Sequence, residues 1–231
     1  MNMDVDRVRS NLANVEERIR RASSRVGRID APRLLVATKY VGAEDMGVLQ
    51  AAGIRLVGEN RAEELESKWQ EWGGAFEFHF IGHLQSRKAR QVLPCATLIH
   101  SVDSIKLVEE LEKRAERPVN VLLEVNVSGE NTKYGILPAH AEAFLQEASG
   151  FQKVRFVGFM TMAPFAQDPE TARPVFRCLR QLRDRLAPGF AGRYVLSELS
   201  MGMSDDYEVA VEEGATIIRV GTALFSNGQG G

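Results

Sequence analysis

The segment VNVLLEVNV, at residues 119–127, is a run of β-branched and apolar residues with single polar residues between them. Such a run is typical of a strand that is buried on both faces of a parallel sheet. LLVAT, at residues 34–38, has the same character near the other end of the chain. The two segments together predict a sheet that lies inside the protein.

Strands and helices alternate on both sides of these segments. Short apolar runs predict eight strands, and amphipathic stretches predict the helices that separate them. We expect strands at residues 34–38, 54–57, 76–81, 97–100, 119–127, 154–159, 194–199 and 216–220. We expect helices between them at residues 45–52, 62–72, 86–92, 104–116, 138–148, 169–186 and 205–213.

This alternation implies parallel strands joined by right-handed crossovers. An open doubly wound sheet and a closed (β/α)8 TIM-type barrel both satisfy it, and the count of eight favours the barrel. No linker-like segment divides the chain, so residues 1–231 are expected to form a single domain. Apolar residues from Val5 to Ile19 recur at spacings of three and four, which predicts an extra N-terminal helix that ends near Gly27 and caps or flanks the barrel.

Composition excludes several classes of protein. The 231 residues are 44% hydrophobic, and 29 basic against 31 acidic residues give a net charge of −2, so nothing points to nucleic acid or an anionic membrane as a partner. Cys95 and Cys178 are too few for a disulfide scaffold and suit a reducing compartment. The N-terminal sequence lacks the apolar stretch of a secretory signal, and no run reaches the ~20 apolar residues of a membrane span. We expect a cytoplasmic protein.

In a barrel of this type the chemistry lies where strands end and the following loops begin. Lys39 directly follows the first predicted strand. Its amine either reaches water or is partly desolvated, and desolvation lowers the pKa of an amine toward the neutral form that attacks a carbonyl. The position of Lys39 alone leaves both alternatives open.

The loops after the seventh and eighth strands carry the ingredients of a phosphate site. Gly202 and Gly221 let the backbone approach an anion closely, and Ser200, Ser204 and Thr222 offer hydroxyl donors. These two loops and a short helix N-terminus form the usual phosphate site of the barrel architecture. Ser204 is alternatively a plain helix cap.

Arg219 interrupts the last apolar strand. Strand alternation places it on the same face as Ile217 and Gly221, which is the interior of the barrel. A guanidinium stays charged, so we expect it to meet a carboxylate or a ligand. Glu59 is expected to pair with Arg219 or Lys39.

The remaining polar residues near strand ends carry weaker signals. Asn60 follows the second strand and offers an amide that both donates and accepts. His79 and His83 are four residues apart, but in a strand and turn they need not share a face, so we expect no metal site. His100 is expected to have an ordinary hydrogen-bonded or exposed role.

An ordered set of motifs extends over nearly the whole chain. They are VATKY at 36–40, GEN at 58–60, HFIGHLQSRK at 79–88, EVNVSGENTKYG at 124–135, GFMTMAP at 158–164, LSMGMSDDYEVAVEEGAT at 199–216 and IRVGTALF at 218–225. Together these motifs closely resemble the pyridoxal-phosphate homeostasis protein family. The resemblance implies a fold-type III barrel, like the N-terminal domain of alanine racemase, that binds pyridoxal 5′-phosphate (PLP). It also implies that the second, β-rich domain of alanine racemase is absent from this chain.

The resemblance further implies which residues hold the cofactor. By the family pattern, Lys39 carries PLP as a Schiff base, and the phosphate loop maps onto Ser204, Gly221 and Thr222, with Ser200 nearby. Arg219 matches the arginine beside the pyridine nitrogen. We add Asn60 as a further cofactor-binding residue and firmly assign no catalytic residue.

Three functions remain open from the sequence. The first, which the resemblance favours, is a PLP-binding protein of vitamin B6 and amino-acid homeostasis that is not an enzyme with strong turnover. The second is a PLP-dependent racemase-like or decarboxylase enzyme, and the third is a cofactor-free Schiff-base aldolase. Apo forms of PLP-dependent enzymes are candidate partners, and the oligomeric state stays open, with a monomer among the alternatives.

Overall fold

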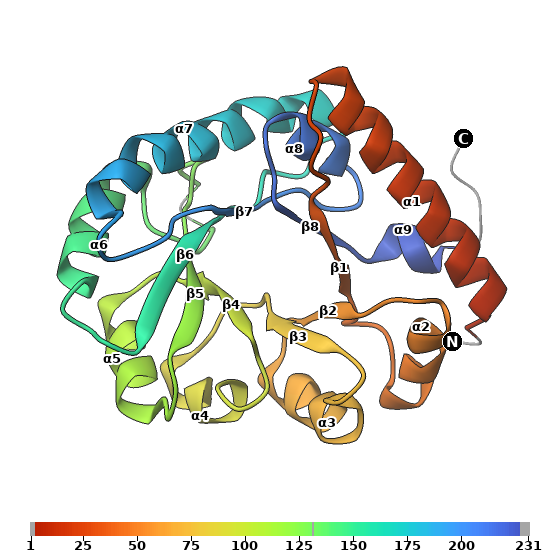
Figure 1. Ribbon diagram of the computed structural model, residues 1–231, viewed down its shortest axis with the longest axis horizontal. Helices are drawn as coiled ribbons and strands as arrows, with labels where there is room; N and C mark the ends of the chain where they lie inside the picture. Colours follow the sequence, from red (N-terminus) through yellow and green to blue (C-terminus); the bar gives the residue numbers. More distant parts are fainter. Residues whose placement is uncertain (1–2, 131, 227–231) are drawn as a thin grey trace.

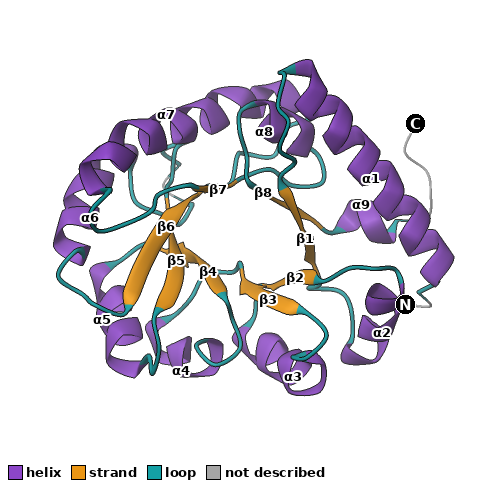
Figure 2. Ribbon diagram, viewed as in Figure 1, coloured by secondary structure: helices purple, strands orange, loops and turns teal. Residues whose placement is uncertain are grey.

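The computed structural model describes residues 3–130 and 132–226, and within them eight parallel strands close into a barrel in sequence order. Figure 2 shows the strands as a ring with the helices outside it. The predicted (β/α)8 TIM-type barrel is therefore confirmed. The strands are β1 (Arg33–Ala37), β2 (Leu56–Glu59), β3 (Glu77–Phe80), β4 (Leu98–Val102), β5 (Val119–Glu124), β6 (Val154–Met160), β7 (Glu198–Ser200) and β8 (Ile217–Val220).

Helices follow the strands and cover the outer face of the barrel. They are α1 (Val5–Arg25), α2 (Met46–Ala51), α3 (Ala62–Trp72), α4 (Ala89–Val92), α5 (Ile105–Arg114), α6 (Ala141–Ala148), α7 (Arg173–Phe190), α8 (Tyr207–Glu212) and α9 (Thr222–Phe225). Short 3-10 turns precede α2, α4, α6 and α7. Within the described stretches, no helix is both long enough and apolar enough to cross a membrane.

The predicted N-terminal helix is present as α1 and flanks the barrel. Asp4 caps it by accepting hydrogen bonds from the backbone N–H groups of Asp6 and Arg7. The buried face of α1 packs beside α8 and α9, as Figure 1 shows at the right of the molecule. The side-chain amide of Asn11 donates to the carbonyl of Leu224 at 3.0 Å, so the two ends of the described chain are joined.

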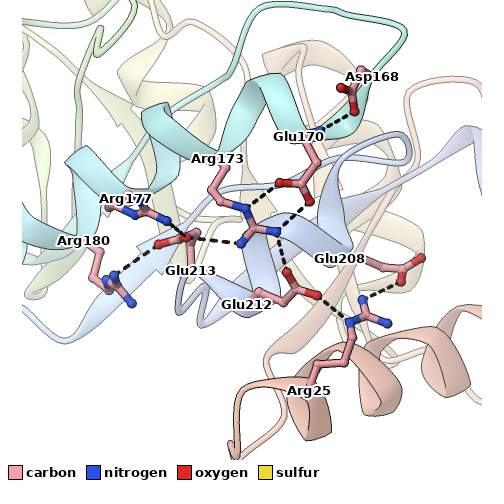
Figure 3. A network of polar contacts seen from close by, with 9 residues as sticks. All are labelled: Arg25, Asp168, Glu170, Arg173, Arg177, Arg180, Glu208, Glu212 and Glu213. Atoms are coloured by element: carbon pink, nitrogen blue, oxygen red, sulfur yellow. Dashed lines mark hydrogen bonds and ion pairs between the residues drawn. The ribbon is translucent and has the colours of Figure 1, made fainter.

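A network of ion pairs ties α8 to α1 and α7 (Figure 3). Glu212 accepts from Arg25 at 2.5 Å and from Arg173 at 2.6 Å, so one carboxylate links all three helices. Glu213 is 5% exposed and pairs with Arg173 at 3.2 Å. Because α8 directly follows the loop that contains Ser204, this network restrains one side of the candidate site.

The core has two parts, one on each side of the strands. A large apolar cluster fills the space between the strands and the helices. A small cluster fills the inside of the barrel, formed by Leu35, Leu98, Leu122, Met160 and Ile217. The rest of the barrel interior holds polar side chains, among them His79, His100, Ser200 and Arg219, which are all buried. This polar content is unusual for a position where branched apolar residues dominate.

Four strands, β3, β5, β7 and β8, are shorter than predicted, and the largest differences are in β7 and β5. The seventh was expected at 194–199, but β7 covers only Glu198–Ser200, because Tyr194 turns outward to pack against the ring of Phe156. The fifth was expected to reach residue 127 but ends at Glu124. There the side chain of Asn126 accepts from the N–H of Gly129 at 3.0 Å and starts a loop, an alternative to strand pairing that asparagine readily offers.

Candidate functional site

The candidate residues meet at one end of the barrel. Lys39 follows β1, Asn60 follows β2, Ser200 ends β7, and Gly221 and Thr222 follow β8. All eight strands are parallel, so their carboxyl ends share one rim. The structure thus brings the termini of the chain's first and last barrel strands together, and β1 pairs directly with β8.

Lys39 is exposed at this rim. Its ammonium lies 4.6 Å from the centroid of the Tyr40 ring, a cation–π contact. The sequence left open whether the amine of Lys39 reaches water or is partly desolvated. In the described conformation it reaches water. An exposed amine at the mouth of the barrel is accessible to a carbonyl compound from solution.

A buried ion pair supports the backbone beside Lys39. Lys68, from α3, is 1% exposed and pairs with Glu59, which is fully buried. Lys68 also donates to the carbonyl of Thr38 at 2.9 Å, and the Thr38 hydroxyl donates to Glu59 at 2.5 Å. The expected pairing of Glu59 with Arg219 or Lys39 is therefore wrong, because a lysine nine residues further along the chain occupies its carboxylate. The pair anchors the peptide that precedes Lys39.

Next to β1 along the rim, a turn after β7 meets the start of α9. The Ser204 hydroxyl oxygen accepts from the backbone N–H of Gly221 at 3.3 Å and of Ala223 at 3.4 Å. Backbone donors of this loop thus converge on an oxygen, which is the arrangement that a phosphate oxygen requires. Ser204 is partly buried, and Thr222 is exposed beside it.

Gly202 makes this turn possible. Its φ is +92°, a conformation that side chains disfavour, and a Cβ there would lie 2.5 Å from the Cβ of Ala210. The carboxylate of Asp206 accepts from the N–H of Met203 at 2.6 Å and closes the turn. Sequence analysis singled out Gly202 for close approach to an anion, and the structure shows that it also allows close approach to α8.

Arg219 points into the barrel, as strand alternation predicted, and is 5% exposed. Its guanidinium donates to the Ser200 hydroxyl at 2.6 Å and to the carbonyl of Thr161 at 3.0 Å. Burial lowers the pKa of Arg219 to about 10, although Asp206 and Glu124 oppose the shift. Arg219 therefore remains a cation at neutral pH and is held by neutral acceptors.

Ser200 lies in the barrel interior. Besides accepting from Arg219, its hydroxyl lies 2.9 Å from Nδ1 of His100, so it belongs to the interior polar cluster rather than to the Ser204 turn. Asn60 is exposed, and Gly82 packs closely over its backbone: a Cβ at Gly82 would lie 2.1 Å from the Asn60 carbonyl oxygen.

Glu124, at the end of β5, is a site residue that the sequence analysis missed. Its side chain is 3% exposed, and its Oε2 atom has no hydrogen-bond partner among the described residues. Burial raises the pKa of Glu124 to about 7, and the nearby Asp103 adds to the shift. Its position as the second polar residue of VNVLLEVNV, facing the same side as Asn120 and Leu122, is the signal that could have revealed it.

The rim thus offers an accessible amine after β1, an inward-facing guanidinium on β8, and a turn at which two backbone N–H groups converge on the Ser204 hydroxyl. The described residues contain no group of three or more histidine, cysteine, aspartate or glutamate side chains arranged to hold a metal ion.

Comparisons with known proteins identify the fold and the family of the chain. Residues 10–227 match the family model of the alanine racemase N-terminal domain. Alanine racemase from Clostridium difficile has the same fold, with a TM-score of 0.74 and 14% identity, and this chain covers 58% of it. The fold and the rim residues thus define a barrel of the alanine racemase N-terminal class.

More similar relatives identify the family. The Pyridoxal phosphate homeostasis protein of Aquifex aeolicus is 42% identical over 93% of this chain and 95% of the relative, and that of Escherichia coli is 36% identical over 93% and 94%. PipY of Synechococcus elongatus, in a structure with PLP bound, has a TM-score of 0.83 and 33% identity, covering 95% of this chain and 100% of PipY. The chain belongs to the pyridoxal phosphate homeostasis protein family.

Proposed function

We propose that this chain binds PLP at the barrel rim as a Schiff base on Lys39, and that it serves cytoplasmic PLP and amino-acid homeostasis without strong turnover. Residues 1–231 act as a single PLP-binding domain in this proposal. The relatives are named for homeostasis of PLP, and a PLP-bound structure of a relative supports the choice of cofactor. Apo PLP-dependent enzymes are candidate recipients of the cofactor.

The observation that carries the proposal is the buried, inward-facing Arg219 at the same end of the barrel as Lys39. PLP supplies an aldehyde that condenses with amines and a pyridine ring that withdraws electrons when its nitrogen is protonated. Arg219 can only donate hydrogen bonds, so a guanidinium beside that nitrogen favours the unprotonated ring. The chain's own residues thus favour holding PLP over activating it.

The other residues have separate tasks in the proposal. The Ser204 turn, with Gly221 and Thr222, binds the phosphate through backbone N–H groups and hydroxyls. The Lys68–Glu59 pair holds the backbone from which Lys39 projects. Asn60 donates to or accepts from the cofactor at the β2 edge of the rim.

A visible absorption spectrum of the full chain mixed with PLP tests the proposal. We expect a Schiff-base band that is absent from Lys39→Arg, which keeps the charge but removes the reactive amine. Lys106→Ala, which removes an exposed lysine on the outer helix α5, is the matched control and should retain the band. A band that persists in Lys39→Arg would overturn the assignment of Lys39.

One observation favours the racemase-like alternative. Glu124, with its pKa raised to about 7 and an unpartnered oxygen, is a titratable group near the same rim. Incubation of the PLP-loaded chain with single L-amino acids in deuterium oxide separates the two functions. Exchange of the α-hydrogen that disappears in Lys39→Arg would favour the enzyme, and no exchange beyond that of free PLP would favour the homeostasis protein.

A further inference from the structure

A continuous row of hydrogen bonds crosses the inside of the barrel from the rim to the opposite end. Arg219 donates to Ser200 at 2.6 Å, and Ser200 lies 2.9 Å from Nδ1 of His100. Nε2 of His100 lies 3.0 Å from Nδ1 of His79, and Nε2 of His79 lies 2.9 Å from the carboxylate of Glu77. The three contacts of the histidine rings are within the normal range for a hydrogen bond, and the contact of Arg219 with Ser200 is slightly shorter.

The two ends of this row dictate the direction of every bond. Arginine has only donors, and an ionised carboxylate has only acceptors. His79 must therefore donate from Nε2 to Glu77, which makes its Nδ1 the acceptor for Nε2–H of His100. Nδ1 of His100 then accepts from the Ser200 hydroxyl, whose oxygen accepts from Arg219. All donors point from Arg219 toward Glu77, and both imidazoles are neutral Nε2–H tautomers.

Electrostatics agree with this single arrangement of protons. Burial lowers the pKa of His79, and burial lowers the pKa of His100 well below its usual value, with His79 adding to that shift. The hydrogen bond from His79 holds the pKa of Glu77 at about 2, against the effect of its partial burial. A proton added to Nδ1 of His79 would face the Nε2–H group of His100 at the 3.0 Å contact, and a proton added to Nδ1 of His100 would face the hydroxyl hydrogen of Ser200 at the 2.9 Å contact.

Charged groups that face the row are present at both ends. Arg33 lies 3.7 Å from Glu77 and 3.4 Å from Glu198 at the far end of the barrel. Glu124 and Asp206 act on Arg219 at the rim. Between these ends the neighbours are the apolar interior cluster, in which burying four polar side chains is costly unless each is paired.

We propose that His100 and His79 are positioning residues that orient the Ser200 hydroxyl and, through it, fix the guanidinium of Arg219 for the cofactor ring. The inference rests on the proposed function only for the identity of the ring. At the far end of the row lies a cavity of about 340 Å³ that is lined by Glu77, His79 and Glu198. Because water reaches Glu77 there, its carboxylate stays ionised, and its charge polarises the hydrogen bonds of the row. Glu77, 45% exposed, thereby influences Arg219 from the other end of the barrel.

The direct test requires no cofactor. Two-bond 1H–15N spectra of the histidine rings in the full chain, recorded with and without PLP, report tautomer and charge. We expect His79 and His100 to be neutral Nε2–H tautomers even at the usual imidazole pKa of about 6.5, where half of the free imidazole carries a second proton. A protonated ring near neutral pH, or an Nδ1–H tautomer at either position, would overturn the inference even if PLP binds at Lys39.

Variants of His100 test the effect on the cofactor. His100→Phe keeps a ring of similar size but removes the acceptor for Ser200, so PLP should dissociate about tenfold more readily, the effect of one hydrogen bond to a charged group. In His100→Asn the side-chain oxygen replaces Nδ1, so retention should stay within about threefold of the original chain. Glu198→Gln, which changes a carboxylate at the same far end but outside the row, is the matched control.

Equal loss of PLP in His100→Phe and His100→Asn would show that the ring serves packing alone and would contradict the inference. If His100→Phe does not fold, the spectra of the histidine rings in the unaltered chain still test the inference. Absence of any PLP adduct in the unaltered chain would contradict the proposed function instead, and would leave the predicted tautomers testable.

Discussion

The two sides of the rim differ in how tightly they are held. On the β1 side, Lys39 is exposed and contacts the neighbouring ring of Tyr40, while the peptide before it is anchored by the buried Lys68–Glu59 pair. On the β7–β8 side, Arg219 and the Ser204 turn are fixed by hydrogen bonds and backed by the ion pairs of α8. This difference suits a protein that binds an anionic group of its ligand tightly and forms a reversible covalent bond at an accessible amine.

The largest effect should come from breaking the anchor of the β1 side. Glu59→Gln leaves the charge of Lys68 buried without its counterion, and removal of one partner of a buried pair costs about 3–5 kcal/mol of unfolding free energy. Urea unfolding measures the loss. The matched control is Glu63→Gln, which breaks the partly exposed pair with Lys88 and should cost less than about 1 kcal/mol. Equal costs for the two variants would contradict the anchoring role.

On the β7–β8 side, Gly202→Ala tests whether the shape of the turn matters. The substitution forces a side chain into a left-handed conformation and against Ala210, which should cost about 1–3 kcal/mol of stability and weaken PLP binding as well. Gly129→Ala changes a glycine of similar φ, +72°, that has open space around it, and isolates the backbone strain from the contact. Unchanged PLP affinity in Gly202→Ala would show that the turn is not part of the phosphate site.

Removal of the Ser204 and Thr222 hydroxyls tests whether they bind the phosphate of PLP. Ser204→Ala combined with Thr222→Val should weaken PLP retention about tenfold, which corresponds to about 1.4 kcal/mol, while thermal unfolding changes little. Dialysis against inorganic phosphate, followed by the absorbance of retained cofactor, measures the effect. Retention equal to that of the unaltered chain would contradict the phosphate assignment.

The smallest effect is expected from Glu213, whose ion pairs hold α8 in place. The stability that these ion pairs contribute should depend on pH. Burial opposes ionisation of Glu213, but hydrogen bonds from Arg177 and Arg173 outweigh it and lower its pKa. A carboxylate with a lowered folded-state pKa stabilises the protein above the unfolded pKa, and this stability is lost as the pH falls through the folded value. Glu213→Gln should therefore cost about 1 kcal/mol near pH 7 and progressively less at acid pH. A cost that is independent of pH would contradict an ionic role.

Regular features were predictable from sequence, because they depend on local periodicity. The strand predicted at 216–220 is present as β8 (Ile217–Val220), and Arg219 points inward as strand alternation predicted. The positions of residues at strand ends led to the candidate residues of the rim, the family motifs agreed with them, and the PLP role of each of them stays a prediction.

Contacts across the barrel were not predictable in the same way. The meeting of His79 with His100, and of Glu59 with Lys68, depends on the register between neighbouring elements, which no single segment encodes. The start of β7 was misplaced for a related reason, since Tyr194 and Leu196 are buried without belonging to a strand, and Val195 between them is exposed. The structure was needed to show that the buried Oε2 atom of Glu124 has no hydrogen-bond partner among the described residues.

The most direct test of the central claim is the location of the covalent adduct. The full chain is incubated with PLP, reduced with borohydride, digested with trypsin and analysed by mass spectrometry. Because trypsin does not cut at a modified lysine, we predict the pyridoxyl adduct on one peptide, residues 34–55, with the modification at Lys39. An adduct on another lysine alone, or none at all, would contradict the account.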